Sequence, residues 1–256
     1  MASVSTGSHR PRHLRAPRRG RPRPARPRRA VVVIGLVAAV LAVVGATTLA
    51  PAVTDAVLGD RVEIAPSTGE LPAVAAAAYV VVDGDTGEAL ASYNADQPRP
   101  VASLAKLMTA RLVLDAGRLD HVATVPPLYI AGDESHAGLE PGDRLSRDEL
   151  LRAMLVASAN DAARTLAVDV AGDEGRFVDM MNAEAAAAGL DATRYANPAG
   201  LDHPAQHSSA ADVVRLARGL MQDTAFRNIV AAESTTIDGS RLPTTNDLLG
   251  AYPGAD

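Results

Sequence analysis

The chain has 256 residues, no cysteine and a formal net charge of −5. Without cysteine, disulfides, thiol catalysis and cysteine-based metal sites are excluded, and the candidate nucleophiles are Ser, Thr, Lys and carboxylates. All ten basic residues of the first thirty positions, a segment called the basic arm below, are Arg. The remaining fifteen basic residues lie after it, together with all thirty acidic residues. Because the part after the arm is acidic, we expect it to bind no nucleic acid.

An uncharged run of twenty residues, Val31–Ala50, follows this basic arm. A helix of that length spans a bilayer. By the positive-inside rule we expect a disordered, Arg/Pro-rich cytoplasmic arm at 1–30, a transmembrane helix or signal-anchor at 31–50, and an extracytoplasmic remainder. Thr48-Leu49-Ala50 is a poor cleavage site, which favours a single-pass anchor in the cell membrane. Cleavage would instead give a secreted protein.

The rest of the chain is interpreted as a linker at 51–74 and one domain at 75–256. The domain begins with two β-rich runs around the turn-forming residues 83–87, which predicts a hairpin. Apolar periodicity and capping residues then predict helices from Ser103 to Gly117, from Ser146 through Leu155, from about Asp161, and near 173–188 and 209–222. Strands followed by helices indicate an α+β fold.

Ser103 and Lys106 are the first candidates for chemistry. Lys106 is the only lysine among the twenty-five basic residues, and it lies one helical turn after Ser103. Residues at i and i+3 share a helix face, which brings the amine within reach of the hydroxyl. Unlike Arg, a desolvated Lys can lose its proton and act as a general base. The alternative is that Ser103 only caps the helix and Lys106 is solvated.

A second pair of polar residues strengthens the catalytic interpretation. Ser103-Leu104-Ala105-Lys106 and Ser158-Ala159-Asn160 match the signatures Ser-x-x-Lys and Ser-x-Asn of the penicillin-recognising serine enzymes. With their flanking segments across 75–256, they resemble the serine D-alanyl-D-alanine carboxypeptidases, the low-molecular-mass penicillin-binding proteins. The resemblance implies the transpeptidase-like fold of β-lactamases and penicillin-binding proteins. It also implies removal of the terminal D-Ala from peptidoglycan stem peptides without metal or cofactor, with β-lactams as inhibitors.

The same resemblance assigns a role to each residue. It implies that Ser103 is the nucleophile and that Lys106 takes its proton. Ser158 would relay a proton to the leaving amine, and Asn160 would hold Lys106 and a substrate amide. Ser103 and Asn160 would thus also contact the substrate. The alternative is that Ser158 or Asn160 only caps the helix predicted from Asp161.

The third signature of these enzymes, Lys-Thr-Gly, is absent because the chain has no second lysine. The run from Tyr252 to Asp256 resembles the segment that directly precedes that signature, so we expect a C-terminally truncated, incomplete fold. Two other functions stay open: a β-lactamase-like hydrolase, and an inactive anchored module with a binding or structural role. His203 and His207 are four residues apart, but Pro204 predicts a loop there, so no metal site is expected.

Overall fold

The computed structural model describes residues 74–128, 130–253 and 255. The predicted cytoplasmic arm, the transmembrane helix at 31–50 and almost all of the linker lie outside these residues. Within this part of the chain, no helix combines the length and apolar character needed to cross a membrane.

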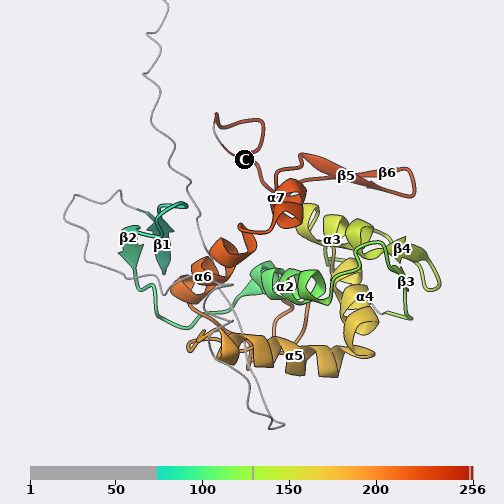
Figure 1. Cartoon of the computed structure of the whole chain (residues 1–256), viewed down its shortest axis with the longest axis horizontal. Coiled ribbons are helices and arrows are strands. Elements are labelled where there is room, and N and C mark those ends of the chain that lie inside the picture. Colours follow the sequence, from blue (N-terminus) through green and yellow to red (C-terminus); the bar gives the residue numbers. More distant parts are fainter. Residues whose placement is uncertain (1–73, 129, 254, 256) are drawn as a thin grey trace, which may run out of the picture.

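Helices and short antiparallel strand pairs make up the described domain (Figure 1). The helical elements are the 3₁₀-turn η1 (Ala102–Ala105), α2 (Lys106–Ala116), α3 (Arg147–Val156), α4 (Asn160–Ala171), α5 (Glu174–Ala187), α6 (Ala210–Leu220) and α7 (Thr224–Val230). The strand pairs are β1 (Tyr79–Val82) with β2 (Ala89–Tyr93), β3 (Val122–Thr124) with β4 (Arg144–Ser146), and β5 (Ser234–Ile237) with β6 (Ser240–Pro243). The expected α+β class is confirmed.

Helix α2 lies in the middle of the domain and packs against α3, α4, α5 and α6 (Figure 1). Its buried side includes Met108, Leu112 and Val113, as the apolar period predicted. The facing helix α4 buries small residues, Ala162, Ala163 and Ala167, which let the two helices approach closely. One hydrophobic cluster therefore holds the helices around α2, whose first turn carries Lys106.

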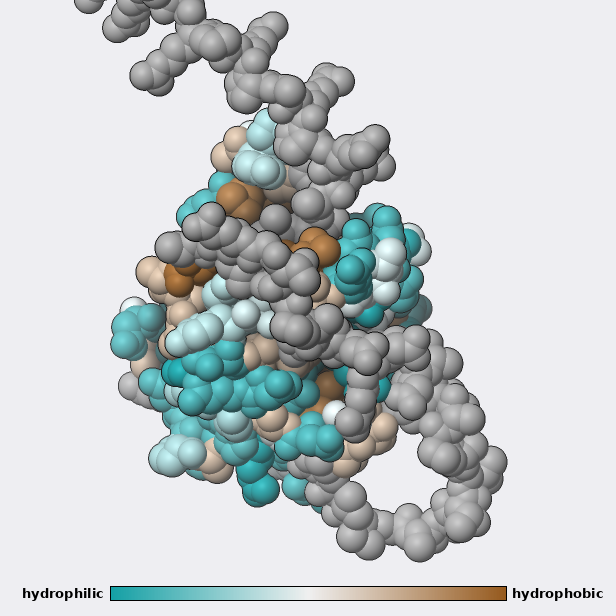
Figure 2. All heavy atoms as spheres, turned by 90° about the vertical axis from the view of Figure 1, so that its left-hand side faces the viewer, coloured by the Kyte–Doolittle hydropathy of each residue, from teal (hydrophilic) through white to brown (hydrophobic). Residues whose placement is uncertain are grey.

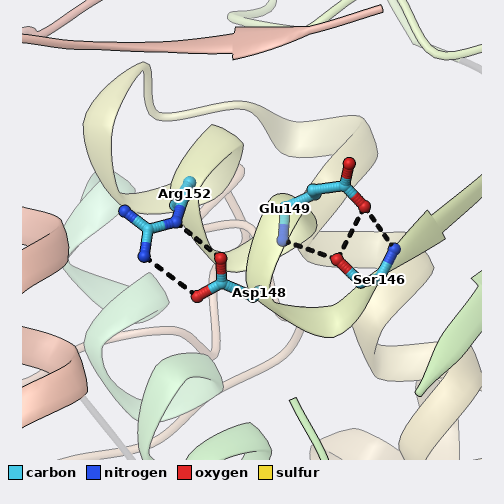
Figure 3. Close-up of polar contacts among 4 residues, drawn as sticks. All are labelled: Ser146, Asp148, Glu149 and Arg152. Carbon is cyan, nitrogen blue, oxygen red and sulfur yellow. Dashed lines mark hydrogen bonds and ion pairs between the residues drawn. The ribbon is translucent and has the colours of Figure 1, made fainter. Parts of the chain in front are cut away.

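The predicted start of α3 is confirmed by a complete capping box (Figure 3). The Ser146 hydroxyl oxygen accepts the Glu149 N–H at 3.2 Å, and the Glu149 carboxylate accepts the Ser146 N–H at 2.7 Å. Two backbone donors that the helix would leave unpaired are thereby satisfied. At the predicted 209–222 helix, Ser209 likewise accepts the Asp212 N–H at 3.2 Å and caps α6.

The predicted first hairpin is also confirmed and packs on α6. Asp83 fixes its turn by accepting the N–H groups of Asp85 and Thr86 at 3.0 and 2.7 Å. Val80 and Val82 of β1 are buried in a second, smaller hydrophobic cluster with α6. Figure 2 views the molecule from the side of this hairpin and shows apolar side chains scattered among hydrophilic ones.

Candidate active site

The nucleophile candidate lies in the 3₁₀-turn that leads into α2. Ser103 is exposed on this turn, and Lys106, the first residue of α2, is only 3% exposed. The Lys106 Nζ and Ser103 Oγ atoms are 3.0 Å apart. The spacing of three residues thus brings amine and hydroxyl into hydrogen-bond contact, as the shared helix face predicted.

Burial changes the acidity of Lys106. Desolvation lowers the pKa of its amine to about 8, and the negative charge of Glu134 partly opposes this shift. About a tenth of the amine is then neutral at pH 7, a far larger fraction than for a solvated lysine. When neutral, the amine can accept the Ser103 proton across the existing 3.0 Å contact.

A backbone carbonyl from a distant loop completes the environment of Lys106. The amine donates to the Ala199 carbonyl oxygen at 2.7 Å, across 93 positions in sequence. The Asn197 carboxamide oxygen shapes this loop by accepting the N–H groups of Gly200 and Leu201 at 2.8 and 2.9 Å. The loop is anchored to α2 by Thr109, whose hydroxyl donates to the Pro198 carbonyl at 2.7 Å.

Gly200 brings this loop against the backbone that carries Ser103. A Cβ atom at position 200 would lie 1.9 Å from the Ala102 carbonyl oxygen, and the Gly200 φ angle is +87°. Both the contact and the backbone conformation require glycine. The sequence alone does not reveal this support, because Gly200 and the nearby Pro204 indicate only a loop.

Ser158 reaches the same hydroxyl from the other side. Its Oγ donates to Ser103 Oγ at 2.9 Å, so Ser103 contacts both Lys106 and Ser158. The Ser158 φ angle is +58°, a left-handed conformation that is costly for a residue with a side chain and is common at functional sites. The N-cap of α4 is Ala159, with no side-chain cap. The alternative that Ser158 serves only as a helix cap is therefore wrong.

The structure places Asn160 beside this cluster, with a partner that was not expected. Its side-chain nitrogen donates to Glu134 Oε2 at 2.9 Å, and its backbone N–H donates to the Ser135 carbonyl at 2.8 Å. Lys106 bonds instead to Ser103 and Ala199. The side chain of Asn160 thus bonds to Glu134, whereas a direct contact with Lys106 was expected. Glu134, on an irregular loop, was missed because its stretch of sequence shows no periodicity.

A cavity of about 460 Å³ opens over Ser103, Lys106 and Ser158, and its lining does not include Asn160 or Glu134. Ser103, Lys106 and Ser158 provide its polar wall, and its other lining residues are mostly apolar, among them Leu107, Met154, Leu155 and Val230. Such a pocket can hold a small organic group against the nucleophile. Among the residues that the structure describes, no group of His, Cys, Asp or Glu is arranged to hold a metal ion.

Solved structures define the class of protein to which this fold and site belong. The crystal structure of penicillin binding protein 6B from Escherichia coli matches with a TM-score of 0.69 and 34% identity, covering 75% of this chain and 64% of that one. Penicillin-binding protein D2 from Listeria monocytogenes, in a cefotaxime-bound form, matches with a TM-score of 0.64 and 32% identity, covering 73% and 78%. The fold is that of the penicillin-binding DD-peptidases.

The sequence then gives the family. Residues 65–253 match the family model of peptidase S11, described as D-alanyl-D-alanine carboxypeptidase. The D-alanyl-D-alanine carboxypeptidase DacD of Salmonella typhimurium is 34% identical over 220 residues, which are 80% of this chain and 55% of that protein. This chain belongs to the peptidase S11 family. It spans about half the length of the curated relatives that it matches.

Proposed function

We propose that this protein is a serine D-alanyl-D-alanine carboxypeptidase that removes the terminal D-Ala from peptidoglycan stem peptides. The observation that carries the proposal is the position of the Ser103 hydroxyl, 3.0 Å from the Lys106 amine and 2.9 Å from the Ser158 hydroxyl. A nucleophile, a base of lowered pKa and a second proton carrier are the groups that acyl transfer from an amide needs. Membership in peptidase S11 supports the substrate class.

The reaction proceeds in two steps. Neutral Lys106 takes the Ser103 proton while Ser103 Oγ attacks the carbonyl carbon between the two D-alanines. As the tetrahedral intermediate collapses, Ser158 gives its proton to the leaving amine and regains one from Lys106, so that D-Ala departs neutral at its nitrogen. Water then attacks the ester carbonyl, and the proton it loses returns to Ser103 as the shortened peptide leaves. The protein itself supplies every proton carrier in this sequence.

β-Lactams are proposed as inhibitors, because a strained lactam presents the same kind of carbonyl to Ser103. The crystal structure of the Listeria protein in its cefotaxime-bound form supports this. Penicillin acylation also distinguishes a carboxypeptidase from the two other functions left open by the sequence. A β-lactamase-like hydrolase would release the hydrolysed drug within seconds to minutes, and an inactive module would form no adduct.

The test is acylation by excess benzylpenicillin, followed by intact-protein mass spectrometry and peptide mapping. We expect the adduct on Ser103, and none in Ser103→Ala. Acylation should be slow in this chain, because it lacks the Lys-Thr-Gly signature and the oxyanion donor that this signature implies. Lys106→Arg should lose at least about a thousandfold in acylation rate, because a guanidinium keeps its proton at any accessible pH. The wild-type rate should rise with pH through about 8, the pKa of Lys106, as the amine becomes neutral. An adduct that forms equally fast in Lys106→Arg would refute this assignment of the base.

We further propose that the protein is anchored in the cytoplasmic membrane by residues 31–50, with its domain on the extracytoplasmic side. The uncharged run and the ten preceding arginines support this topology. An alkaline phosphatase moiety fused after Pro72 should be active, because this reporter folds only outside the cytoplasm. Activity of a cytoplasmic reporter at the same position would contradict the proposal. If the run is cleaved after export, the domain will appear in the medium.

A further inference from the structure

Glu134 connects an irregular loop to the start of α4. One carboxylate oxygen, Oε1, accepts the Ala131 N–H at 3.1 Å, and the other, Oε2, accepts the Asn160 side-chain amide at 2.9 Å. The side chain is partly buried. A carboxylate that bridges two elements in this way is held in one place, unlike a solvated surface glutamate.

The first turn of α4 fixes the loop that carries Glu134. The Asn160 N–H donates to the Ser135 carbonyl at 2.8 Å. Next to it, the Asp161 carboxylate accepts the N–H groups of Ala137 and Leu139, each at 3.0 Å, and Asp161 is only 1% exposed. Because these bonds join alternate loop residues, Ser135, Ala137 and Leu139, to the first two residues of the helix, the position of Glu134 relative to Asn160 is determined by the fold.

The bond to Glu134 also determines which way the Asn160 amide faces. An ionised carboxylate can only accept hydrogen bonds, so the side-chain nitrogen of Asn160, and not its oxygen, must face Glu134. The oxygen is then left on the other side of the amide group, as an acceptor. Rotating the Asn160 amide by 180° would place its oxygen against the Glu134 carboxylate. The repulsion between these two acceptors would destabilise the site by more than the hydrogen bond stabilises it.

Glu134 acts on Lys106 through its charge. It is the charged group that raises the Lys106 pKa against the effect of burial. Charged residues on the helices packed against α2 mostly have other partners. On α3, Asp148 pairs with Arg152 and Glu149 bonds to Ser146; on α4, Asp161 bonds to the loop and Arg164 pairs with Glu174. On α5, Glu184 pairs with Arg111 of α2, and on α6, where Arg215 is buried, Asp212 bonds to Thr193 and Ala192. Asp169 of α4 pairs with Arg147 and His121.

We propose that Glu134 is a positioning residue of this site: its carboxylate orients the Asn160 amide and keeps a negative charge near the Lys106 amine. The orienting part rests on the function proposed above, because the oriented Asn160 oxygen would accept an N–H of the stem peptide. The charge effect on Lys106 is independent of that function. Both parts can be measured.

The first measurement uses the single lysine of the chain. Growth on lysine with a ¹³C-labelled side chain places the label only at Lys106, so its NMR signal titrates without assignment. We expect a wild-type midpoint near pH 8. In Glu134→Gln, which keeps the shape and removes the charge, the midpoint should fall by about 0.5 to 1 pH unit. The matched control is Asp133→Asn, which removes an exposed charge from the adjacent position.

The second measurement is the penicillin acylation rate on its high-pH plateau, where Lys106 is neutral in every variant. Glu134→Ala, which leaves Asn160 free to turn, should lower this plateau about tenfold or more, whereas Asp133→Asn should leave it unchanged. Circular dichroism and thermal unfolding check that each variant is folded. If the wild type forms no adduct, the proposed function fails, and the NMR titration alone then decides the role of Glu134.

Two results would overturn the proposal. The charge effect is refuted if the Lys106 midpoint in Glu134→Gln moves no further than in Asp133→Asn. The orienting role is refuted if folded Glu134→Ala keeps the wild-type plateau rate. A loss of stability alone would move neither the midpoint nor the plateau of the folded protein, so both readouts separate positioning from a general structural effect.

Discussion

Gly200 shows how closely the backbone approaches itself behind the nucleophile. A side chain there must displace the Ala102 carbonyl, which is 1.9 Å from the Cβ position, and must adopt a φ of +87°. We expect Gly200→Ala to lower the free energy of unfolding by about 2 to 4 kcal/mol, the combined effect of backbone strain and overpacking. It should also slow acylation at Ser103. Urea unfolding and penicillin labelling are the two measurements.

Gly239 provides the matched control for this prediction. Its φ angle is +80°, but no atom lies within 4 Å of its Cβ position. Gly239→Ala should therefore cost only about 1 kcal/mol, from the backbone conformation alone, and leave acylation unchanged. Equal losses in the two variants would show that the Ala102 contact adds nothing.

The sequence predicted the side chains of the site better than its backbone contacts. Ser103 and Lys106 could be placed together because helical geometry relates residues three apart. No comparable local rule connects Ser158 to Ser103, and that pairing came from family resemblance. The Ala199 carbonyl could not be predicted, since every residue has one and only the tertiary structure selects which of them meets Lys106.

At the scale of elements, the capping box of α3 can be separated from the ion pair beside it (Figure 3). Ser146→Ala removes an acceptor for the Glu149 N–H and should cost about 1 kcal/mol in unfolding free energy. Arg152→Ala breaks only the pair with Asp148, in which both side chains are more than a third exposed, and should cost at most about 0.5 kcal/mol. Chemical denaturation of both variants gives the comparison; a larger loss in Arg152→Ala would contradict it.

The long helices were predictable because caps and apolar periodicity extend over ten or more residues. The strand pair β3–β4 and the hairpin β5–β6 were not, and neither was α7. β3 and β4 have three residues each, too few to display an alternating pattern. The seven residues of α7 span only two turns, and the helix depends on burial of Phe226 and Ile229 against the rest of the domain.

The described part of the domain has two hydrophobic clusters of unequal size. The larger one joins the helices around α2, and the smaller one holds β1 to α6 through Val80, Val82 and Val214. Because the β1–β2 hairpin forms a sheet of only two strands, it should open at a lower free energy than the helices. Native-state hydrogen exchange should show amides of β1 exchanging at least about tenfold faster than those of α4.

Val80→Ala tests whether the two clusters are energetically separate. Loss of this buried side chain should destabilise the hairpin by about 2 kcal/mol and accelerate exchange in β1, while exchange in α4 stays the same. Leu166→Ala in α4 is the reciprocal variant and should accelerate exchange in both regions, because α6 needs the larger cluster. Parallel acceleration of β1 and α4 in Val80→Ala would mean that the clusters open as one unit.

The bond from Lys106 to the Ala199 carbonyl has a consequence for the order in which the protein folds. It closes a loop of 93 positions, so it is a non-local contact, and we expect it to form after the local helices have nucleated. A refolding chain can thus regain nearly all of its helix while the amine that activates Ser103 is still solvated and protonated. If the proposed function holds, we expect penicillin reactivity to return later in refolding than helical content.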